Sequence, residues 1–317
     1  MSETKVSWMK RFWAVVRYEM LWNIRKKMFI GALIFAFIFA TLNIALPAAL
    51  GVSENPYFTV TFSVGSFVFV LFAIVTGAYC ISGEYEKGTI IPLLTKPVSR
   101  TMVFLGKLFA IFIVILATYG VIYTYTIIGG LLVYGPQNSL HLVPLALLGD
   151  ILSTFIWVGV VIVAGTISKN SLLAILTTLG LFVALLFGTS IVGQLSDNPG
   201  PLNYIPGSGA SGTMNVMTGQ NITISTVTIN TFAATTTGTD SIGVNLIKAT
   251  LYPDANVNFY YTDIQNLINP NSTEPPRLLY SESITLIAVR SAVFALLYTE
   301  ILFVAALFVF KRWEISE

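Results

Sequence analysis

One short polar stretch between two long apolar segments holds the residues best suited to a specific task. Glu84 and Glu86 supply two carboxylates, and Gly88 with Thr89 forms a break at which a new helix can begin. The apolar run 90–94 follows, and such a patch on a loop needs a membrane surface or a protein partner to cover it. The stretch therefore has the features of a docking element. The residues expected to take part are Glu84, Glu86, Gly88, Thr89, Ile91, Leu94, Pro97, Ser99 and Arg100.

The motifs of self-sufficient enzymes are missing from the sequence. The only Gly-Lys pair, Gly106-Lys107, precedes Leu108, so there is no P-loop, and neither Gly-x-Ser-x-Gly nor His-Glu-x-x-His occurs. The single His141 cannot form a metal site alone, and the single Cys80 excludes an intrachain disulfide and a cysteine-based zinc cluster. We therefore expect a chain that is not an enzyme by itself and that holds no cofactor or metal.

Composition places the chain in a membrane. Its 317 residues are 55% hydrophobic and 10% charged, with a mean hydropathy of +0.78. Soluble globular proteins carry about 25% charged residues, so this chain cannot cover its surface with polar groups in water. These values exclude a soluble enzyme, and they also exclude a disordered protein, which would be rich in charge and poor in aromatic residues.

Six apolar runs are each long enough to cross the hydrocarbon core as a helix, which takes about 20 residues. Their continuous apolarity lacks the alternation of strands in a membrane β-barrel. The runs are 29–50, 58–81, 108–134, 142–167, 172–195 and 284–310. We therefore predict an all-α membrane protein with six transmembrane helices.

The basic residues predict the orientation. Fourteen lysines and arginines lie in the N-terminal segment, the loops after the second and fourth runs, and the C-terminal tail, whereas two, Lys248 and Arg277, lie in the opposite loops. Because cytoplasmic loops carry the excess of Lys and Arg, we expect a multi-pass plasma-membrane protein with both termini in the cytoplasm. Residues 196–283 are then extracellular.

The runs divide the chain into four regions, which are 1–27, 28–195 with the loop 82–101, 196–283, and 284–317. In the first region, Trp8, Phe12 and Trp13 begin an apolar pattern at helical spacing among basic residues, which predicts an amphipathic helix in the membrane interface. A helix packed on another protein is the alternative, and the two are compatible.

The region 196–283 is rich in Thr, Ser, Asn and Gly. Its stretch 221–232 combines β-propensity with partial alternation, so we predict a small β-rich extracellular insertion between helices five and six. A mobile polar loop is the alternative. Both N-x-[ST] sequences of the chain, at Asn221 and Asn271, fall in this region and are possible N-glycosylation sites.

Three ionisable residues lie inside the apolar runs and are functional candidates for that reason. By helical rise, Asp150 and Arg290 lie about 12 Å and about 9 Å from the outer ends of their spans, and similar depth with opposite charge favours a pair. Alternatively, Arg290 reaches the outer headgroups and Asp150 faces water. Glu300, about 24 Å from the outer end, either lines a translocation path or bonds a neighbouring helix.

The polar stretch resembles ABC-2 type permeases, the membrane subunits of type V ABC exporters. The shared pattern is Glu-x-x-x-Gly-Thr, Leu-Leu-x-x-Pro, Ser-Arg and a Gly-Lys at the head of the next helix. The matching residues are Glu84, Gly88, Thr89, Leu93, Leu94, Pro97, Ser99, Arg100, Gly106 and Lys107. The predicted N-terminal helix, six spans and cytoplasmic ends also fit this family, whereas the long polar segment 196–283 departs from its short re-entrant helices.

The resemblance implies one half of a transporter. Two such membrane subunits pair with two ATP-binding cassette subunits, which hold ATP and Mg, and the segment after the second span acts as the coupling helix. The expected partners are that ATPase, a second copy or a paralogous permease, and membrane lipid, but no nucleic acid. The expected function is export of a hydrophobic or amphipathic substrate. The alternatives are a complex that transmits conformational change to its extracellular domain without transport, and an ATP-independent channel or receptor.

Overall fold

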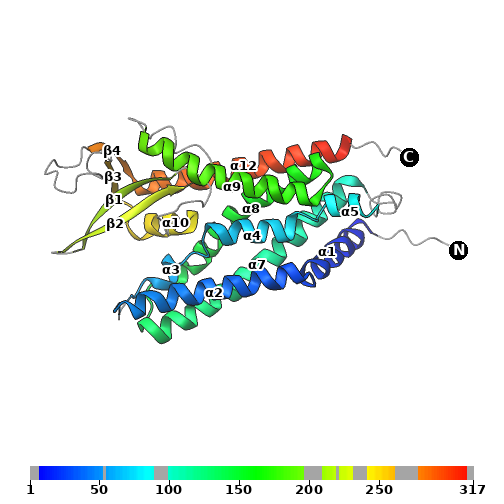
Figure 1. Ribbon diagram of the computed structural model, residues 1–317. Helices are drawn as coiled ribbons and strands as arrows, with labels where there is room; N and C mark the ends of the chain where they lie inside the picture. Colours follow the sequence, from blue (N-terminus) through cyan, green and yellow to red (C-terminus); the bar gives the residue numbers. More distant parts are fainter. Residues whose placement is uncertain are drawn as a thin grey trace.

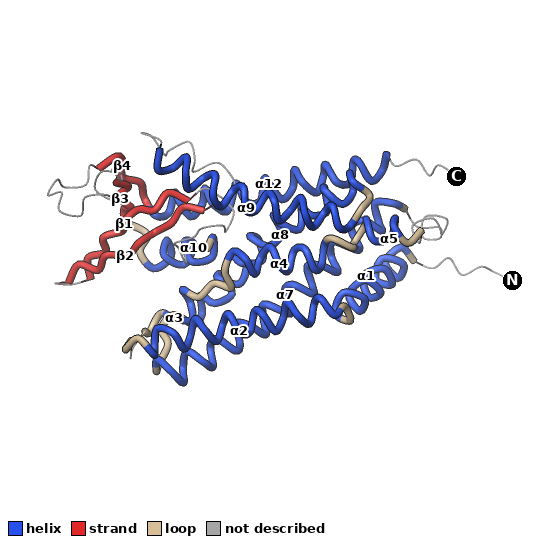
Figure 2. Tube along the Cα trace, in the orientation of Figure 1, coloured by secondary structure: helices blue, strands red, loops and turns tan. Residues whose placement is uncertain are grey.

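The computed structural model describes residues 7–52, 55–88, 99–195, 209–218, 221–230, 241–260 and 278–312. Most of the described chain is helical, and its long helices run lengthwise in one bundle (Figures 1 and 2). The helices are α1 (Trp8–Ile24), α2 (Lys27–Ala49), α3 (Phe58–Thr61), α4 (Ser66–Gly77), α5 (Ser82–Glu86), α7 (Arg100–Tyr134), η1 (Leu140–Leu142), α8 (Val143–Ser168), α9 (Ser171–Leu195), α10 (Ile242–Leu251) and α12 (Ile284–Arg312).

Five helical stretches among the described residues are long and apolar enough to cross a membrane. They are Lys27–Ala49, Ser66–Glu86, Arg100–Tyr134, Leu140–Ser168 and Ile284–Arg312. α9 is a further apolar helix of 25 residues, in which the apolar stretch identified is Ser171–Leu185. The architecture is that of an all-α membrane protein, and the count of six spans stays a prediction that depends on α9.

The bundle has two distinct ends (Figure 1). α1, α5 and the C-terminal turn of α12 lie at one end, called here the α1 end, and the strands lie at the opposite end, called here the sheet end. The first and last described helices therefore share one end of the bundle, as the prediction of two termini on one side requires. Which side of the membrane each end faces stays a prediction.

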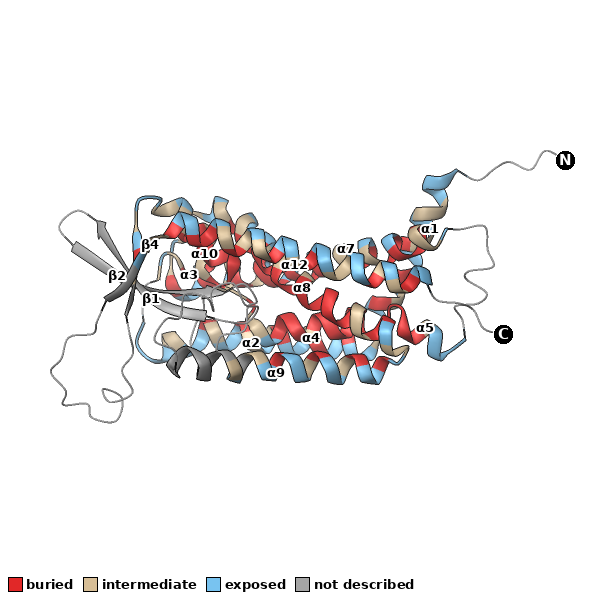
Figure 3. Cartoon of the chain, turned by 90° about the horizontal axis from the view of Figure 1, so that it is seen from above, coloured by how far each residue is buried: buried red, intermediate tan, exposed pale blue. Residues whose placement is uncertain are grey.

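The core of the bundle runs along α4, α7 and α8 (Figure 3). Phe69, Phe72, Tyr119 and Trp157 are among its fully buried side chains. α2, α9 and α12 instead expose many apolar side chains, such as Leu42, Leu172 and Ile301. Exposed apolar faces on long helices are expected where hydrocarbon, not water, is the solvent.

The predicted continuous span 58–81 is wrong, because residues 62–65 break it into α3 and α4. Gly65 adopts φ +85°, a conformation that residues with a Cβ rarely take. A Cβ there would also lie 2.9 Å from the ring of Phe39. Apolarity shows that a segment lies in a membrane but not that its backbone is helical throughout. Other buried groups can form hydrogen bonds with the backbone N–H and C=O groups of an unwound turn.

Four antiparallel strands form a sheet in the order β2-β1-β3-β4. They are β1 (Gly209–Thr218), β2 (Asn221–Asn230), β3 (Asn256–Tyr260) and β4 (Leu278–Ser283). β2 covers most of the stretch predicted to favour strands, and Asn221 is its first residue, paired with Thr218. Asn271 lies outside the described residues. That this region forms a separate extracellular domain stays a prediction.

The short helix α10 was not expected from the sequence. Its apolar residues Ile242, Val244 and Ile247 are fully buried, and it packs against α8 and α12. The crossing with α8 is close because Gly149 and Gly243 face each other, and a Cβ on Gly149 would collide with the backbone of Gly243. Part of the region between α9 and α12 therefore belongs to the bundle itself.

Candidate functional site

The candidate site is the surface around α5 at the α1 end. α5 follows α4 after a short turn, and its first residues, Ser82 and Gly83, are buried. Its last turn is exposed and ends at Gly88, which adopts φ +64° with no atom of the described residues near the position of a Cβ. One side of α5 therefore faces the bundle, and the other faces the surroundings.

A buried ion triad fixes α5 to two neighbouring helices. The Lys107 ammonium on α7 donates to Glu19 Oε2 on α1 and to Glu84 Oε1 on α5, each at 2.8 Å. The side chains of Lys107 and Glu19 are 4% and 3% exposed, and that of Glu84 is 21% exposed. Because charges in such a site are costly unless paired, the triad holds α1, α5 and α7 in one arrangement.

The second carboxylate of α5 caps α9. Glu86 Oε1 accepts the backbone N–H of Ser171 at 2.6 Å, and Glu86 Oε2 accepts the Ser171 hydroxyl at 3.0 Å. A carboxylate at a helix N-terminus satisfies free N–H groups and is favoured by the helix dipole. In addition, the Lys169 ammonium donates to Tyr85 Oη at 3.3 Å. α5 is therefore also bonded to the turn between α8 and α9.

Lys26 connects the junction of α1 and α2 to α4. Its ammonium donates to Asn23 Oδ1 at 2.7 Å and to the Val75 carbonyl at 3.3 Å, and it lies 3.6 Å from the centre of the Trp22 ring. Removal from water lowers the pKa of Lys26 to about 7, although the nearby Glu19 charge favours the protonated form.

The predicted N-terminal helix is present as α1 and packs on α7 of its own chain. Gly106 allows this contact, because a Cβ there would lie 3.0 Å from Val15. Phe12 and Trp13 both contact the Phe109 ring. Trp8 and Trp13 remain half-exposed, as an interfacial helix would require, and the position of α1 in the membrane interface stays a prediction.

The predicted docking residues have different surroundings. Thr89, Ile91, Leu94 and Pro97 lie outside the described residues. The Ser99 hydroxyl accepts the Met102 N–H at 3.2 Å and caps α7, which confirms the predicted helix cap. Arg100 donates to the Lys311 carbonyl at 3.1 Å, near the end of α12. Ser99 and Arg100 therefore fix the start of α7, whereas Glu84 and Glu86 hold α5 itself.

The predicted pair between Asp150 and Arg290 is wrong. The guanidinium of Arg290 donates to both oxygens of Glu282 at 2.7 and 2.8 Å, because β4 leads directly into α12 and places the two side chains together. The alternative for Asp150 is also wrong, since this residue is fully buried and does not face water. Its carboxylate accepts hydrogen bonds from Ser63, the Val64 backbone and Tyr123.

Glu300 lies on an exposed face of α12, between exposed Leu297 and Ile301. No hydrogen bond or ion pair joins it to another residue within the described ranges. No neighbouring helix in the described part of the chain therefore satisfies this carboxylate.

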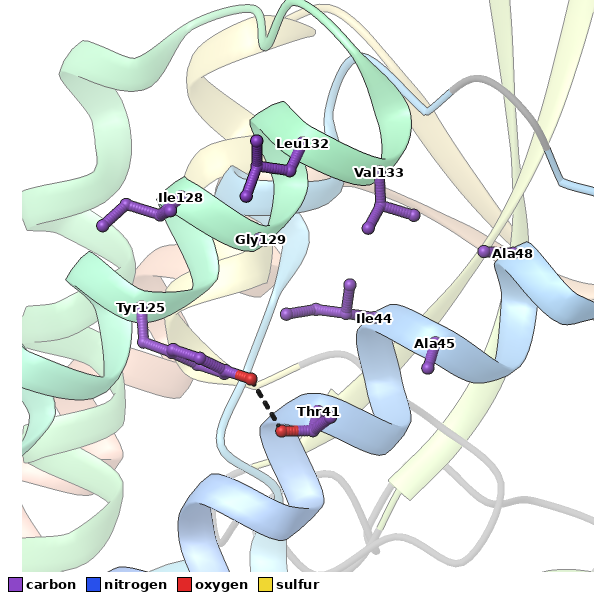
Figure 4. Close-up of a pocket in the computed structure, with 9 residues that line it drawn as sticks. All are labelled: Thr41, Ile44, Ala45, Ala48, Tyr125, Ile128, Gly129, Leu132 and Val133. Carbon is purple, nitrogen blue, oxygen red and sulfur yellow. Dashed lines mark hydrogen bonds between the residues drawn. The ribbon is translucent and has the colours of Figure 1, made fainter.

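An apolar groove of about 480 Å³ lies between α2 and α7 near the sheet end (Figure 4). Thr41 and Tyr125 supply its two hydroxyls, which hydrogen-bond to each other at 2.8 Å. The residues that line it are Thr41, Ile44, Ala45, Ala48, Tyr125, Ile128, Gly129, Leu132 and Val133. The groove fits a hydrocarbon chain better than a polar ligand. In the described part of the chain, no group of three His, Cys, Asp or Glu side chains is placed to hold a metal ion.

The sequence reasoning missed Glu19 and Ser171. A signal for Glu19 was available, because Val16, Glu19 and Asn23 share one helical face and all three are buried. An acidic side chain on the packed face of an amphipathic helix indicates a buried cation nearby. Ser171 carries no such signal, since its role depends on where α5 lies.

Comparison with known proteins adds one positive match. The family model described as "ABC-2 family transporter protein" matches residues 13–315. The match extends from α1 to the residues just after α12, so it includes the site around α5 and the strands. No curated protein matches the chain.

Proposed function

The chain belongs to the ABC-2 family of transporter proteins, and on that premise we propose that it is the permease subunit of an ATP-binding cassette exporter. A separate ATPase subunit hydrolyses ATP, and the chain moves a hydrophobic or amphipathic substrate outward. The α1 end then faces the cytoplasm, as the excess of basic residues there favours.

The observation that carries this proposal is the way α5 is held. Through Lys107, Glu84 contacts α7 and α1, and Glu86 contacts the start of α9. A push on α5 or on the adjoining residues 89–98 would therefore reach four helices at once, since α5 also continues from α4. Rigid-body movement of packed helices is the usual way in which a local contact changes a whole domain.

In this proposal the two carboxylates position the docking element rather than touch the ATPase. Tyr85 and Lys87 are exposed on α5 and its last turn, and the apolar residues 90–94 follow directly. This surface and the residues next to it are the proposed contact with the ATPase subunit, which also supplies the ATP and Mg.

The groove between α2 and α7 favours the proposal that the substrate is apolar, or that a lipid binds there. Its walls are hydrocarbon, and its two hydroxyls already satisfy each other. A polar ligand would gain no hydrogen bond there to replace those it makes with water. Substrates with an extended apolar part, such as lipids, hydrophobic peptides or drugs, suit this surface.

A second permease chain, identical or paralogous, completes the proposed transporter. The α12 face around Glu300 is the clearest place for an additional contact or for the translocation path. A carboxylate that faced lipid at this depth would cost about 2.5–3.5 kcal/mol. N-glycosylation at Asn221 and Asn271 is proposed for a host that modifies extracellular segments.

The first test is purification of the tagged chain from its native host in mild detergent, with identification of its partners by mass spectrometry. We expect a stoichiometric P-loop ATPase that is lost in Ile91→Asp and reduced in Lys87→Glu. Lys311→Glu is the matched control, because it reverses an exposed lysine at the same end. Glu84→Lys is less informative, since a lysine there would face Lys107 and disturb α5 itself.

Two results would overturn the proposal. Absence of an ATPase across several detergents would favour an ATP-independent channel or receptor. Equal retention of the ATPase in Ile91→Asp, Lys87→Glu and Lys311→Glu would show that the docking element lies elsewhere.

A second function is also supported, in which the complex transmits conformational change to the sheet end without transport. The observation in its favour is the burial of α10 between α8 and α12. ATPase activity that no candidate substrate changes, together with binding partners for the sheet end, would favour this function.

A further inference from the structure

Asp150 lies where four segments of the chain meet. It belongs to α8, and its Oδ2 accepts the Val64 N–H at 3.2 Å and the Tyr123 hydroxyl at 2.9 Å. Its Oδ1 accepts the Ser63 hydroxyl at 3.3 Å. Ser241, the buried N-cap residue of α10, lies beside this carboxylate. Asp150 therefore joins α7, α8 and the break between α3 and α4, next to the start of α10.

Two of the residues beside Asp150 lie at or just before helix N-termini. Val64 lies just before α4, and Ser241 is the N-cap residue of α10, whose hydroxyl accepts the Val244 N–H. Helix N-termini carry partial positive charge, which favours a carboxylate at this point. No ion pair among the described residues involves Asp150. The buried carboxylate is therefore held by neutral groups from different segments of the chain.

The helix that begins beside Asp150 leads to the candidate site. We call the stretch Ser66–Glu86 the α4–α5 rod, because it connects the break at residues 62–65 to α5 at the α1 end. Displacement of α5 along the bundle axis would reach Ser63 and Val64 at the other end of this rod. Both of these residues are bonded to Asp150, whose carboxylate lies beside the start of α10.

α10 packs so closely against α8 that the two helices would have to move together. A Cβ on Gly243 would lie 2.5 Å from the carbonyl oxygen of Ala146, so the backbones of α8 and α10 are in direct contact. Beyond α10, the Ile284 N–H donates to the Ala255 carbonyl at 3.0 Å, and Arg290 holds Glu282 of β4. The sheet is thus joined to α12 on one side and to Asp150, through α10, on the other.

We propose that Asp150 is a positioning residue that carries movement of the α4–α5 rod to α10 and so to the sheet end. The inference rests on the proposed function, because the ATPase subunit would supply that movement. The sheet end would change its position with the nucleotide state of the ATPase, and the residue responsible would lie far from α5, where the ATPase acts.

The test is hydrogen–deuterium exchange by mass spectrometry on the purified complex with the ATPase. Exchange is compared without nucleotide and with ATP and vanadate. In the wild type we expect amides of α10 to change between the two states, together with those of residues 62–65. In Asp150→Asn this nucleotide-dependent difference in α10 should fall by about tenfold, the effect of losing a hydrogen bond to a charged group, while the ATPase stays bound and active.

Tyr119→Phe is the matched control. Tyr119 is also fully buried on α7, and its hydroxyl bonds Thr154 at 2.6 Å, one turn along α8 from Asp150. This variant should keep the wild-type difference in α10. Tyr123→Phe removes a single donor from Asp150 and should give a partial loss, so it decides the question if Asp150→Asn does not fold.

The outcomes separate this inference from the proposed function. If the ATPase binds but exchange in wild-type α10 is the same in both nucleotide states, the inference is overturned and the proposed function stands. The inference also fails if Asp150→Asn and Tyr123→Phe keep the full difference. If no ATPase is found with the wild-type chain, the proposed function fails and the inference fails with it.

Discussion

Replacement of Lys107 by methionine tests the ion triad directly. Methionine keeps most of the apolar stem but removes the ammonium that lies 2.8 Å from both Glu19 and Glu84. The carboxylates of Glu19 and Glu84 would then remain without the ammonium between them, and Glu19 would be almost fully buried without its ion-pair partner. Its Oε1 atom already lacks a hydrogen-bond partner among the described residues, and the nearby Lys26 ammonium forms no ion pair with Glu19 among those residues.

The structure allows the cost to be estimated. Each hydrogen bond to a charged group contributes about 1.5–3 kcal/mol, and two are lost. Removal of one member of a buried ion pair destabilises proteins by about 3–5 kcal/mol, and the loss of two such hydrogen bonds gives a similar value. We therefore expect Lys107→Met to lower the free energy of unfolding by about 3–5 kcal/mol. We expect Glu84→Gln to cost less, about 1–2 kcal/mol, because its side chain is 21% exposed and water screens part of the interaction.

The assay is the free energy of unfolding in mixed micelles, measured by tryptophan fluorescence as SDS replaces the mild detergent. Lys87→Met is the control, since an exposed lysine at the same end should change stability by less than about 0.5 kcal/mol. The double variant Glu19→Gln/Lys107→Met should lose less stability than the sum of the losses in the two single variants, because the buried Glu19 charge is removed together with its partner.

The reasoning would be refuted by either of two results. A Lys107→Met variant within about 1 kcal/mol of the wild type would mean that the triad contributes little beyond what surface ion pairs do. Additive single effects in the Glu19→Gln/Lys107→Met cycle would mean that the two side chains do not interact energetically.

Three further predictions concern other parts of the bundle. Gly243→Val should displace α10 and destabilise the protein by about 1–3 kcal/mol, seen as faster proteolysis of the sheet end. Gly180→Ala should have no such effect, because no atom of the described residues lies near its Cβ position. Because burial lowers the pKa of Lys26 from 10.5 to about 7, the unfolded chain binds more protons between pH 7 and 10.5. The free energy of unfolding should therefore rise with pH across this window more steeply in the wild type than in Lys26→Met, and equal slopes in SDS titrations would contradict this. Ser99→Ala should cost about 1 kcal/mol through loss of the α7 cap, whereas Ser99→Asp should retain stability; the same unfolding assay distinguishes them.

Several features could be read from local sequence alone. Long apolar runs identified α2, α7, α8 and α12, because the hydrocarbon core requires about 20 apolar residues from any helix that crosses it. The cap at Ser99 and the break at Gly88 were also predictable, since caps and left-handed turns depend on one or two residues. The pattern from Glu84 to Lys107 indicated the family, because all of its residues lie in one short segment of the chain.

The partners of the charged residues could not be read in this way. Arg290 was expected near Asp150 by depth, but Glu282 lies closer because β4 runs directly into α12. Depth gives only the position of a side chain along the helix axis. The face of the helix on which the side chain lies decides which residues it contacts. For the same reason Glu19 was not recognised as a partner of Lys107, 88 residues away in the chain.

The sequence by itself determined that the protein is a membrane protein, where most of its helices run and which family it resembles, because hydropathy, helix signals and motifs are properties of neighbouring residues. Only the tertiary structure decided that residues 62–65 unwind, that α10 enters the bundle and that Asp150 joins them. These features exist because backbone groups buried away from water must find partners. Those partners, such as Tyr123 for the Phe62 carbonyl and Asp150 for the Val64 N–H, come from segments that only folding brings together.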